Sequence, residues 1–250
     1  MDKRIGAQLY TIRDFCKNEN DFDLSMKKIS DIGYKTVQVS GIGDVAPARV
    51  KEICDKYSLE IICTHRPFEE YRDDLDKVID YHSALGCDIC GLGSMHHDYL
   101  TEDGINKFIK IANRASDTLK KSGFTFAYHN HCFEFMKIKG KYIFDILKDE
   151  TDIDFIVDVY WLAYAAQNPA AVIEGLGKRA KIVHFKDLAI NIMNIEMAEV
   201  MEGNLDFDAI INACEKAGVK AAFVEQDICK RDPFESLKIS YNNLTAKGFV

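Results

Sequence analysis

The sequence predicts an α/β fold of the (β/α)8 TIM-barrel class, on three observations. Eight short apolar runs alternate with amphipathic, helix-like stretches. This alternation is typical of βαβ units with a parallel sheet, and near-continuous apolar runs indicate strands buried on both faces. The chain has 250 residues, the usual length of one eightfold barrel. We therefore expect residues 1–250 to form a single barrel domain.

The expected elements follow one another in a regular order. The strands are predicted at Ile5–Tyr10, Thr36–Ser40, Glu60–Thr64, Asp88–Gly93, Thr125–His129, Asp154–Val157, Lys181–His184 and Ala221–Glu225. The helices are predicted near residues 21–32, 46–57, 69–85, 101–122, 141–149, 169–177, 207–217 and 232–247. An open doubly wound sheet is the alternative. It is disfavoured because the segment after the first run, Gln8–Arg13, has no glycine-rich phosphate loop.

A repeated local pattern supports eight similar units. Four helix-like stretches end in a glycine shortly before the next apolar run, at Gly33, Gly86, Gly123 and Gly218. Glycine accepts the left-handed conformation that ends a helix and redirects the chain. Repeated βα units of this kind close naturally into a barrel.

Composition excludes several classes of partner. The net charge is −8, and no basic stripe is present, so nucleic acid is not expected as a partner. No apolar stretch resembles a signal peptide or is long enough to span a bilayer, so we expect a cytoplasmic protein without a membrane partner. The eight cysteines are then reduced. Cys87 and Cys90 form a C-x-x-C pattern, but on a strand they face opposite sides, which favours core packing.

Ionisable side chains end four consecutive predicted strands. These residues are His129, Asp158, His184 and Glu225. The C-terminal ends of barrel strands form the active site, and burying such groups is costly unless they are paired or bind a metal. Imidazole and carboxylate ligands suit Mn, Fe, Co or Zn better than Mg. The pattern therefore predicts a catalytic divalent-metal site.

Several motifs in this order resemble the sugar phosphate isomerase/epimerase family with a xylose-isomerase-like TIM barrel. They are Gln8–Arg13, His129–Phe135, Asp158–Trp161, Val183–Asp187, Glu202–Phe207 and Val224–Asp227, and together they cover nearly the whole chain. The resemblance implies metal ligands from strands 5 to 8, which fall on His129, Asp158, His184 and Glu225.

The chain departs from the family pattern at the first of these ligands. Better-known members carry Glu at the end of strand 5, where this sequence has His129. Either His129 replaces the carboxylate, or Glu134 reaches back from the following loop. His129 is preferred because it stands at the strand end. In epimerases of the family, the strand-5 Glu is also one of two acid/base groups, so its replacement puts a two-sided epimerisation in doubt.

The remaining candidates are assigned to catalysis or substrate binding. Glu225 or Glu134 is expected to act as the base, and Lys186 to stabilise an enediolate. For Lys186 the alternative is a loop ion pair with Asp187. The expected substrate-binding residues, some of which have a packing or capping role as the alternative, are Gln8, His65, Arg66, His131, Trp161 and Glu202.

The predicted function is a metal-dependent isomerase or epimerase acting on a small sugar, keto-sugar or sugar phosphate through an enediolate. The metal would polarise the carbonyl and acidify the neighbouring C–H. The alternative is a lyase or dehydratase that expels a β-leaving group from a keto-sugar or keto-glycoside. A further alternative is an inactive barrel that binds a sugar. A DNA-repair endonuclease is disfavoured by the acidic charge. The sequence leaves the metal, substrate phosphorylation and oligomeric state open.

Overall fold

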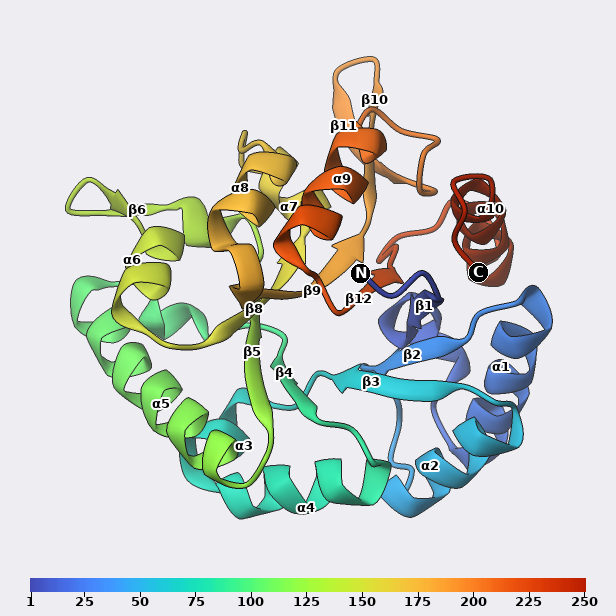
Figure 1. Ribbon diagram of the computed structural model, residues 1–250, viewed down its shortest axis with the longest axis horizontal. Helices are drawn as coiled ribbons and strands as arrows, with labels where there is room; N and C mark the ends of the chain where they lie inside the picture. The colour runs from blue at the N-terminus through green and yellow to red at the C-terminus, as the bar shows by residue number, and fades with distance from the viewer.

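Eight parallel strands close into a barrel surrounded by helices (Figure 1). The computed structural model describes residues 1–250. Around the barrel the strand order is β1-β12-β9-β8-β5-β4-β3-β2. Their bounds are β1 Ile5–Gln8, β2 Thr36–Val39, β3 Glu60–Thr64, β4 Ile89–Leu92, β5 Thr125–His129, β8 Asp154–Asp158, β9 Ala180–Phe185 and β12 Ala221–Val224. The predicted fold class is confirmed, and all eight strands coincide with predicted apolar runs.

Helices follow the strands as expected. The α-helices are α1 Glu19–Ile32, α2 Pro47–Lys56, α3 Phe68–Asp73, α4 Leu75–Leu85, α5 Glu102–Lys121, α6 Ile143–Glu150, α7 Val159–Tyr164, α8 Pro169–Leu176, α9 Phe207–Ala217 and α10 Pro233–Thr245. Short 3-10 turns are η1 Leu9–Phe15, η2 His97–Tyr99, η3 Phe133–Phe135 and η4 Gly177–Arg179. All four glycines of the predicted helix ends have positive φ, from 64° to 125°.

The single helix expected at residues 69–85 is wrong, because two helices occupy this segment. Asp74 ends α3 and starts α4 with φ −147° and ψ 74°, which are not helical values. Its side chain accepts a hydrogen bond from the Lys77 N–H and so caps α4. The apolar periodicity continues through Asp74, which is why the break was not visible in the pattern.

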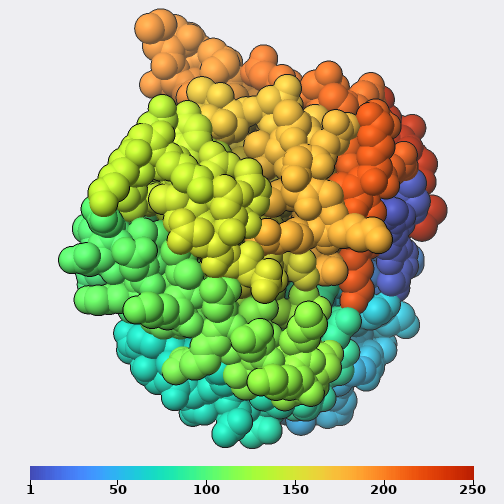
Figure 2. All heavy atoms as spheres, turned by 60° about the vertical axis from the view of Figure 1, so that its left-hand side comes forward, coloured from blue at the N-terminus to red at the C-terminus, as the bar shows by residue number.

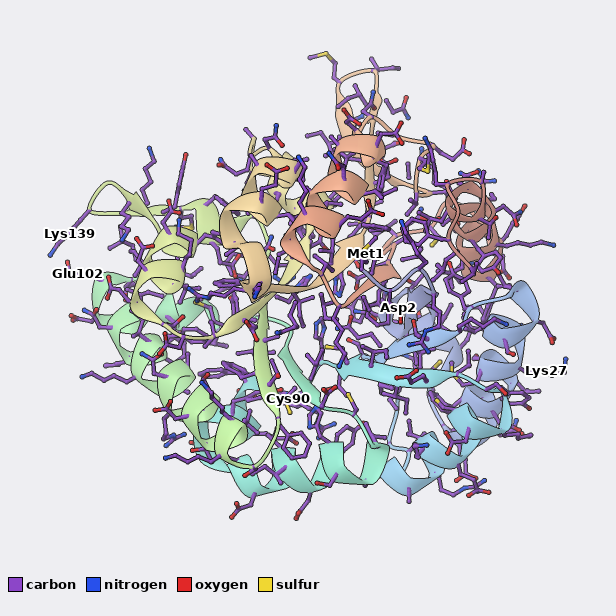
Figure 3. All side chains as sticks on the ribbon, viewed as in Figure 1. Met1, Asp2, Lys27, Cys90, Glu102 and Lys139 are labelled. Carbon is purple, nitrogen blue, oxygen red and sulfur yellow. The ribbon has the colours of Figure 1, made fainter.

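Two hairpins were not predicted, and the second strand of the first occupies the start of the helix expected near residues 141–149. One pairs β6 Lys137–Ile138 with β7 Lys141–Tyr142, and Lys139 at its turn contacts Glu102 of α5 (Figure 3). The other pairs β10 Asp187–Asn191 with β11 Asn194–Ala198. This second hairpin projects from the body of the molecule, at the upper left of Figure 2.

Two apolar clusters hold the barrel together. One of 59 buried residues lies largely between strands and helices. A smaller cluster joins the barrel strands and consists of Ile62, Cys63, Ile89, Ala127, Ile156, Ile182, Ala221 and Phe223. The C-terminal strand ends are thereby left to polar side chains.

All eight cysteines are unpaired, and six are fully buried. Cys87 precedes β4, and Cys90 lies within it (Figure 3). Burial raises the pKa of the Cys87 thiol to about 12, which disfavours a reactive thiolate. The C-x-x-C pattern therefore has a packing role. None of the helices combines the length and apolar character needed to cross a membrane.

Candidate metal and active site

The four predicted metal ligands lie together at the C-terminal ends of four neighbouring strands. His129 ends β5, Asp158 ends β8, His184 lies in β9 and Glu225 directly follows β12. One ligand atom from each lies within 4.8 Å of all the others, and all four residues are buried. These residues are up to 96 positions apart in the sequence. They meet because β5, β8, β9 and β12 are neighbours in the closed barrel.

Hydrogen bonds fix the orientation of both imidazoles. His129 Nδ1 lies 3.0 Å from the Gly93 carbonyl oxygen, so an Nδ1–H donates there and Nε2 faces the cluster. His184 Nε2 lies 2.7 Å from Gln38 Oε1, so an Nε2–H donates to the amide oxygen and Nδ1 faces the cluster. Such partners set the tautomer and ring orientation of metal-binding histidines.

In each of the two carboxylates, a hydrogen bond from outside the cluster holds one oxygen and leaves the other directed at the cluster. The backbone N–H of Trp161 donates to Asp158 Oδ1 at 3.0 Å, which leaves Oδ2 directed at the cluster. Gln8 Nε2 donates to Glu225 Oε1 at 2.7 Å, and Glu225 Oε2 has no hydrogen-bond partner. Each carboxylate therefore presents one oxygen to the same point.

The donor set fits a divalent metal. His184 Nδ1 and Glu225 Oε2 are 2.9 Å apart, yet both are buried without a properly aligned hydrogen bond. Ligand atoms that bind one metal at about 2.1 Å lie about 3.0 to 3.4 Å apart. Two imidazoles with two carboxylates suit Mn, Fe, Co or Zn better than Mg.

Lys186 adds a buried cation beside the cluster. Its Nζ lies 2.7 Å from Asp227 Oδ2, 3.4 Å from Asp158 Oδ2 and 3.6 Å from Glu225 Oε2. Burial lowers the pKa of Lys186, but these carboxylates outweigh it and raise the pKa above its usual value, so the ammonium stays charged. With neutral imidazoles, three carboxylates and one ammonium leave two negative charges, which one divalent cation would balance.

The cluster also shifts the pKa of its own members. Burial lowers the pKa of His184, but the charges of Glu225 and Asp158 raise it to about 9. Burial raises the pKa values of the two carboxyl groups, but Lys186 and the imidazoles hold them below their usual range. The carboxylates are therefore ionised at neutral pH, and a metal must displace a proton from His184.

A pocket of about 560 Å³ opens over the cluster. It is lined by seven of the predicted site residues, namely Gln8, His65, Arg66, His129, His131, Lys186 and Glu225. The Nε2 atom of His65 is buried without a partner, while its Nδ1 lies 3.3 Å from Ser40 Oγ. The pocket thus contains polar atoms that are free to bind a ligand.

Glu134 does not face the metal cluster. It is fully buried; one oxygen accepts from the Tyr128 hydroxyl and the other from the His131 N–H at 2.8 Å. Burial raises the pKa of Glu134 to about 7. The alternative in which Glu134 reaches back to the ligand cluster is therefore not supported: the preferred residue His129 lies in the four-residue cluster, whereas Glu134 holds the loop after β5. Its expected role as base loses support for the same reason.

Trp161 and Glu202 lie outside the pocket wall. Trp161 packs 5.5 Å from the His131 ring, with its ring 5.1 Å from Lys186 Nζ. Glu202 is exposed and accepts a hydrogen bond from Asn243 Nδ2 at 2.8 Å. The structure therefore supports an indirect role for Trp161 and none for Glu202 in substrate binding.

Two residues of the site had no role in the sequence analysis. Gln38 orients His184 from the opposite side of the barrel, and Asp227 lines the pocket beside Lys186. The signal for Asp227 was its position two residues beyond Glu225, on the same segment. Gln38 also ends a predicted strand, but nothing in the sequence pairs β2 with β9.

Comparisons with known proteins agree with this geometry. Residues 26–233 match the family described as xylose isomerase-like TIM barrel, and the chain belongs to this family. A solved structure of a sugar phosphate isomerase/epimerase from Parabacteroides distasonis is 26% identical, covers 100% of this chain and 96% of its own, and has a TM-score of 0.84.

Two relatives are named inosose dehydratase. The protein from Clostridium beijerinckii is 22% identical over 87% of this chain and 86% of its own length. The protein from Geobacillus thermodenitrificans is 23% identical over 69% of each. The similarities therefore include both isomerase/epimerase and dehydratase names on the same barrel.

Proposed function

We propose that this barrel is a divalent-metal-dependent dehydratase or lyase that acts on a small polyhydroxy ketone, such as a keto-sugar. The observation that carries the proposal is the placement of the carboxylates and the lysine of the pocket on one side. Asp227, Glu225 and Lys186 come from β9 and β12, whereas the β5 side presents His129 and turns Glu134 away. Elimination needs one group that removes the proton, whereas epimerisation needs a second on the opposite face.

The chain's own residues have distinct parts in this reaction. His129, Asp158, His184 and Glu225 would hold the metal. When bound, the metal supplies Lewis acidity that polarises the ketone and acidifies the adjacent C–H. Glu225 Oε1 accepts from Gln8 and Oε2 is directed at the cluster, where it would bind the metal, so Glu225 is not assigned as the base.

Asp227 is the carboxylate left for proton transfer. Its side chain lines the pocket and is 21% exposed, and Lys186 Nζ donates to Oδ2 at 2.7 Å. Asp227 takes the proton from the carbon next to the ketone, and Lys186 stabilises the negative charge that develops on oxygen. The C–O bond of the β-hydroxyl then breaks, the hydroxyl leaves as water with the proton that Asp227 took, and the electron pair of the broken C–H bond becomes part of the new C=C bond.

The comparisons support elimination and also favour a second candidate. Both curated relatives are named inosose dehydratase. The Parabacteroides structure, at 26% identity, carries the name of an isomerase/epimerase. Isomerisation along one face of the substrate would also suit a single proton-transferring group, so it is the second candidate. Both candidates share removal of the proton beside the ketone.

The test compares proton exchange with metal content. Asp227→Asn should retain the metal but lose most exchange of the substrate α-proton with deuterated water. Asp158→Ala should lose both. Glu134→Gln is the matched control and should retain both. Loss of water, detected by mass spectrometry, separates elimination from isomerisation. Exchange that survives in Asp227→Asn contradicts the assigned base, and sugar binding without exchange in the wild type indicates a sugar-binding barrel.

A further inference from the structure

We propose that the pocket selects an uncharged, unphosphorylated ligand, because both cations in its wall, Arg66 and Lys186, are already paired with carboxylates of the chain. This inference rests on the proposed function and narrows its substrate class. A phosphate ester carries about −1.5 to −2 charges at neutral pH. Binding it requires cationic or N–H donors that are not already in use.

Arg66 is the arginine in the pocket wall, and its guanidinium is paired with the carboxylate of Glu70. Its Nε donates to Glu70 Oε2 at 2.8 Å, and its Nη2 donates to Glu70 Oε1 at 2.6 Å. The guanidinium also lies 4.0 Å from the centroid of the Tyr81 ring. Glu70 is buried, so this is a bidentate pair in a low-dielectric environment. A phosphate would have to share a cation that is already paired, or displace Glu70 and leave its carboxylate with only Lys77.

Lys186 is the second cation of the wall, and it is surrounded by three carboxylates. Once a divalent metal balances the remaining charge, the site is neutral overall. A neutral ligand preserves this balance. A phosphate would instead add negative charge beside Asp227 and Glu225, which are buried or half-buried.

A typical position for phosphate in this fold is filled by the chain itself. Barrel enzymes frequently bind phosphate in the loops after strands 7 and 8. Here the seventh barrel strand is β9, and Asp187 follows it, buried. Its carboxylate accepts four backbone N–H groups at 2.7 to 3.2 Å, those of Leu188, Met201, Gly203 and Leu205.

The fit around Asp187 is too close for an exchange of anions. A Cβ on Gly203 would lie 2.4 Å from Asp187 Oδ1, so only glycine allows this approach. The N–H groups that could form an anion site therefore stabilise a carboxylate that belongs to the fold. Arg66, Lys186 and this loop are three separate places where a phosphate could bind, and each is closed by an acidic side chain.

The experiment uses the sole tryptophan as a reporter. Trp161 lies beside His131 and Lys186, so its fluorescence should respond to occupancy of the pocket. The metal-loaded wild type is titrated with D-fructose, D-fructose 6-phosphate and inorganic phosphate. We expect the free ketose to bind at least about tenfold more tightly than its phosphate ester. This ratio corresponds to the loss of one charge-assisted hydrogen bond of the chain when the ester binds. Inorganic phosphate should not bind.

A variant without the Glu70 charge should gain affinity for phosphate. Glu70→Gln frees the Arg66 guanidinium and should raise affinity for inorganic phosphate at least about tenfold. Glu69→Gln removes the same charge from an exposed neighbouring position and should change nothing. Phosphate binding by the wild type, or tighter binding of the ester, overturns the proposal. Absence of phosphate binding by a folded, metal-loaded Glu70→Gln overturns the part given to Glu70. The wild-type titrations decide the ligand class even if the variant does not fold.

The two proposals fail in different ways. Deuterium exchange reports the chemistry, and fluorescence reports only the ligand class. If deuterium exchange is faster with the phosphate ester than with the free ketose, this inference is contradicted and the proposed reaction stands. If the protein binds the free ketose more tightly but catalyses no exchange, this inference stands and the proposed reaction is contradicted.

Discussion

Gln38 and His184 face each other across the inside of the barrel, with Gln38 Oε1 2.7 Å from His184 Nε2. They are 146 residues apart in sequence and lie on β2 and β9, which are not neighbours in the barrel. The amide oxygen accepts the Nε2–H and therefore directs Nδ1 toward the metal ligands. This contact links the N-terminal half of the chain to the candidate metal centre.

Replacing Gln38 should weaken metal binding without removing any ligand. Gln38→Leu deletes the acceptor for His184 Nε2–H, and loss of such a partner typically lowers metal affinity about 10–100-fold. Titration calorimetry with Mn²⁺ or Zn²⁺ measures the change. Gln167→Leu is the matched control, because its amide donates only to the Ala165 carbonyl. Unchanged affinity in Gln38→Leu would show that His184 is oriented by packing alone.

Metal binding should release protons and strengthen as pH rises. Glu225 and Asp158 raise the pKa of His184 to about 9 against the opposing effect of burial, so His184 is protonated at neutral pH. A histidine that binds a metal must be neutral, so metal and proton compete for Nδ1. Apparent affinity should therefore increase about tenfold per pH unit up to about pH 9. Calorimetry in buffers of different ionisation enthalpy counts the released protons. A count of zero at pH 7 contradicts this.

Glu134 should affect stability and not metal content. Burial raises the pKa of this carboxyl to about 7 from its usual 4.5, so between these values the folded chain holds a proton that the unfolded chain has released. The free energy of unfolding of the metal-free protein should therefore fall from pH 4.5 to 7 because of this group, by about 3 kcal/mol. Glu134→Gln should abolish this contribution. Urea unfolding at several pH values tests it, with elemental analysis as the check on metal.

A substitution in the turn of the β10–β11 hairpin should stabilise the protein. Ile192 has φ +58° although it is β-branched, and it is 90% exposed. A left-handed backbone costs such residues about 1–2 kcal/mol, whereas Asn tolerates it. Ile192→Asn should therefore raise the free energy of unfolding by about 1 kcal/mol in urea. Ile190→Asn, on the adjacent strand, should not. A destabilised Ile192→Asn would mean that the exposed isoleucine makes a contact needed for stability.

The sequence by itself determined the barrel and the strand ends that carry its chemistry. The alternation of apolar runs with helical stretches and the glycines at helix ends are both local signals. Each depends only on the conformation of neighbouring residues. His129, Asp158, His184 and Glu225 were readable because barrel geometry assigns strand ends to the site.

Only the tertiary structure decided which side chains meet. The direction of Glu134 depends on the Tyr128 hydroxyl and a loop N–H, and the pairing of Gln38 with His184 depends on closure of the barrel. Neutralisation of Arg66 by Glu70 is local in sequence but follows from the start of a short helix that the periodicity did not resolve. These relationships rest on hydrogen bonds of about 3 Å, which a pattern of residue types does not encode because it records the order of residues and not the directions of side chains.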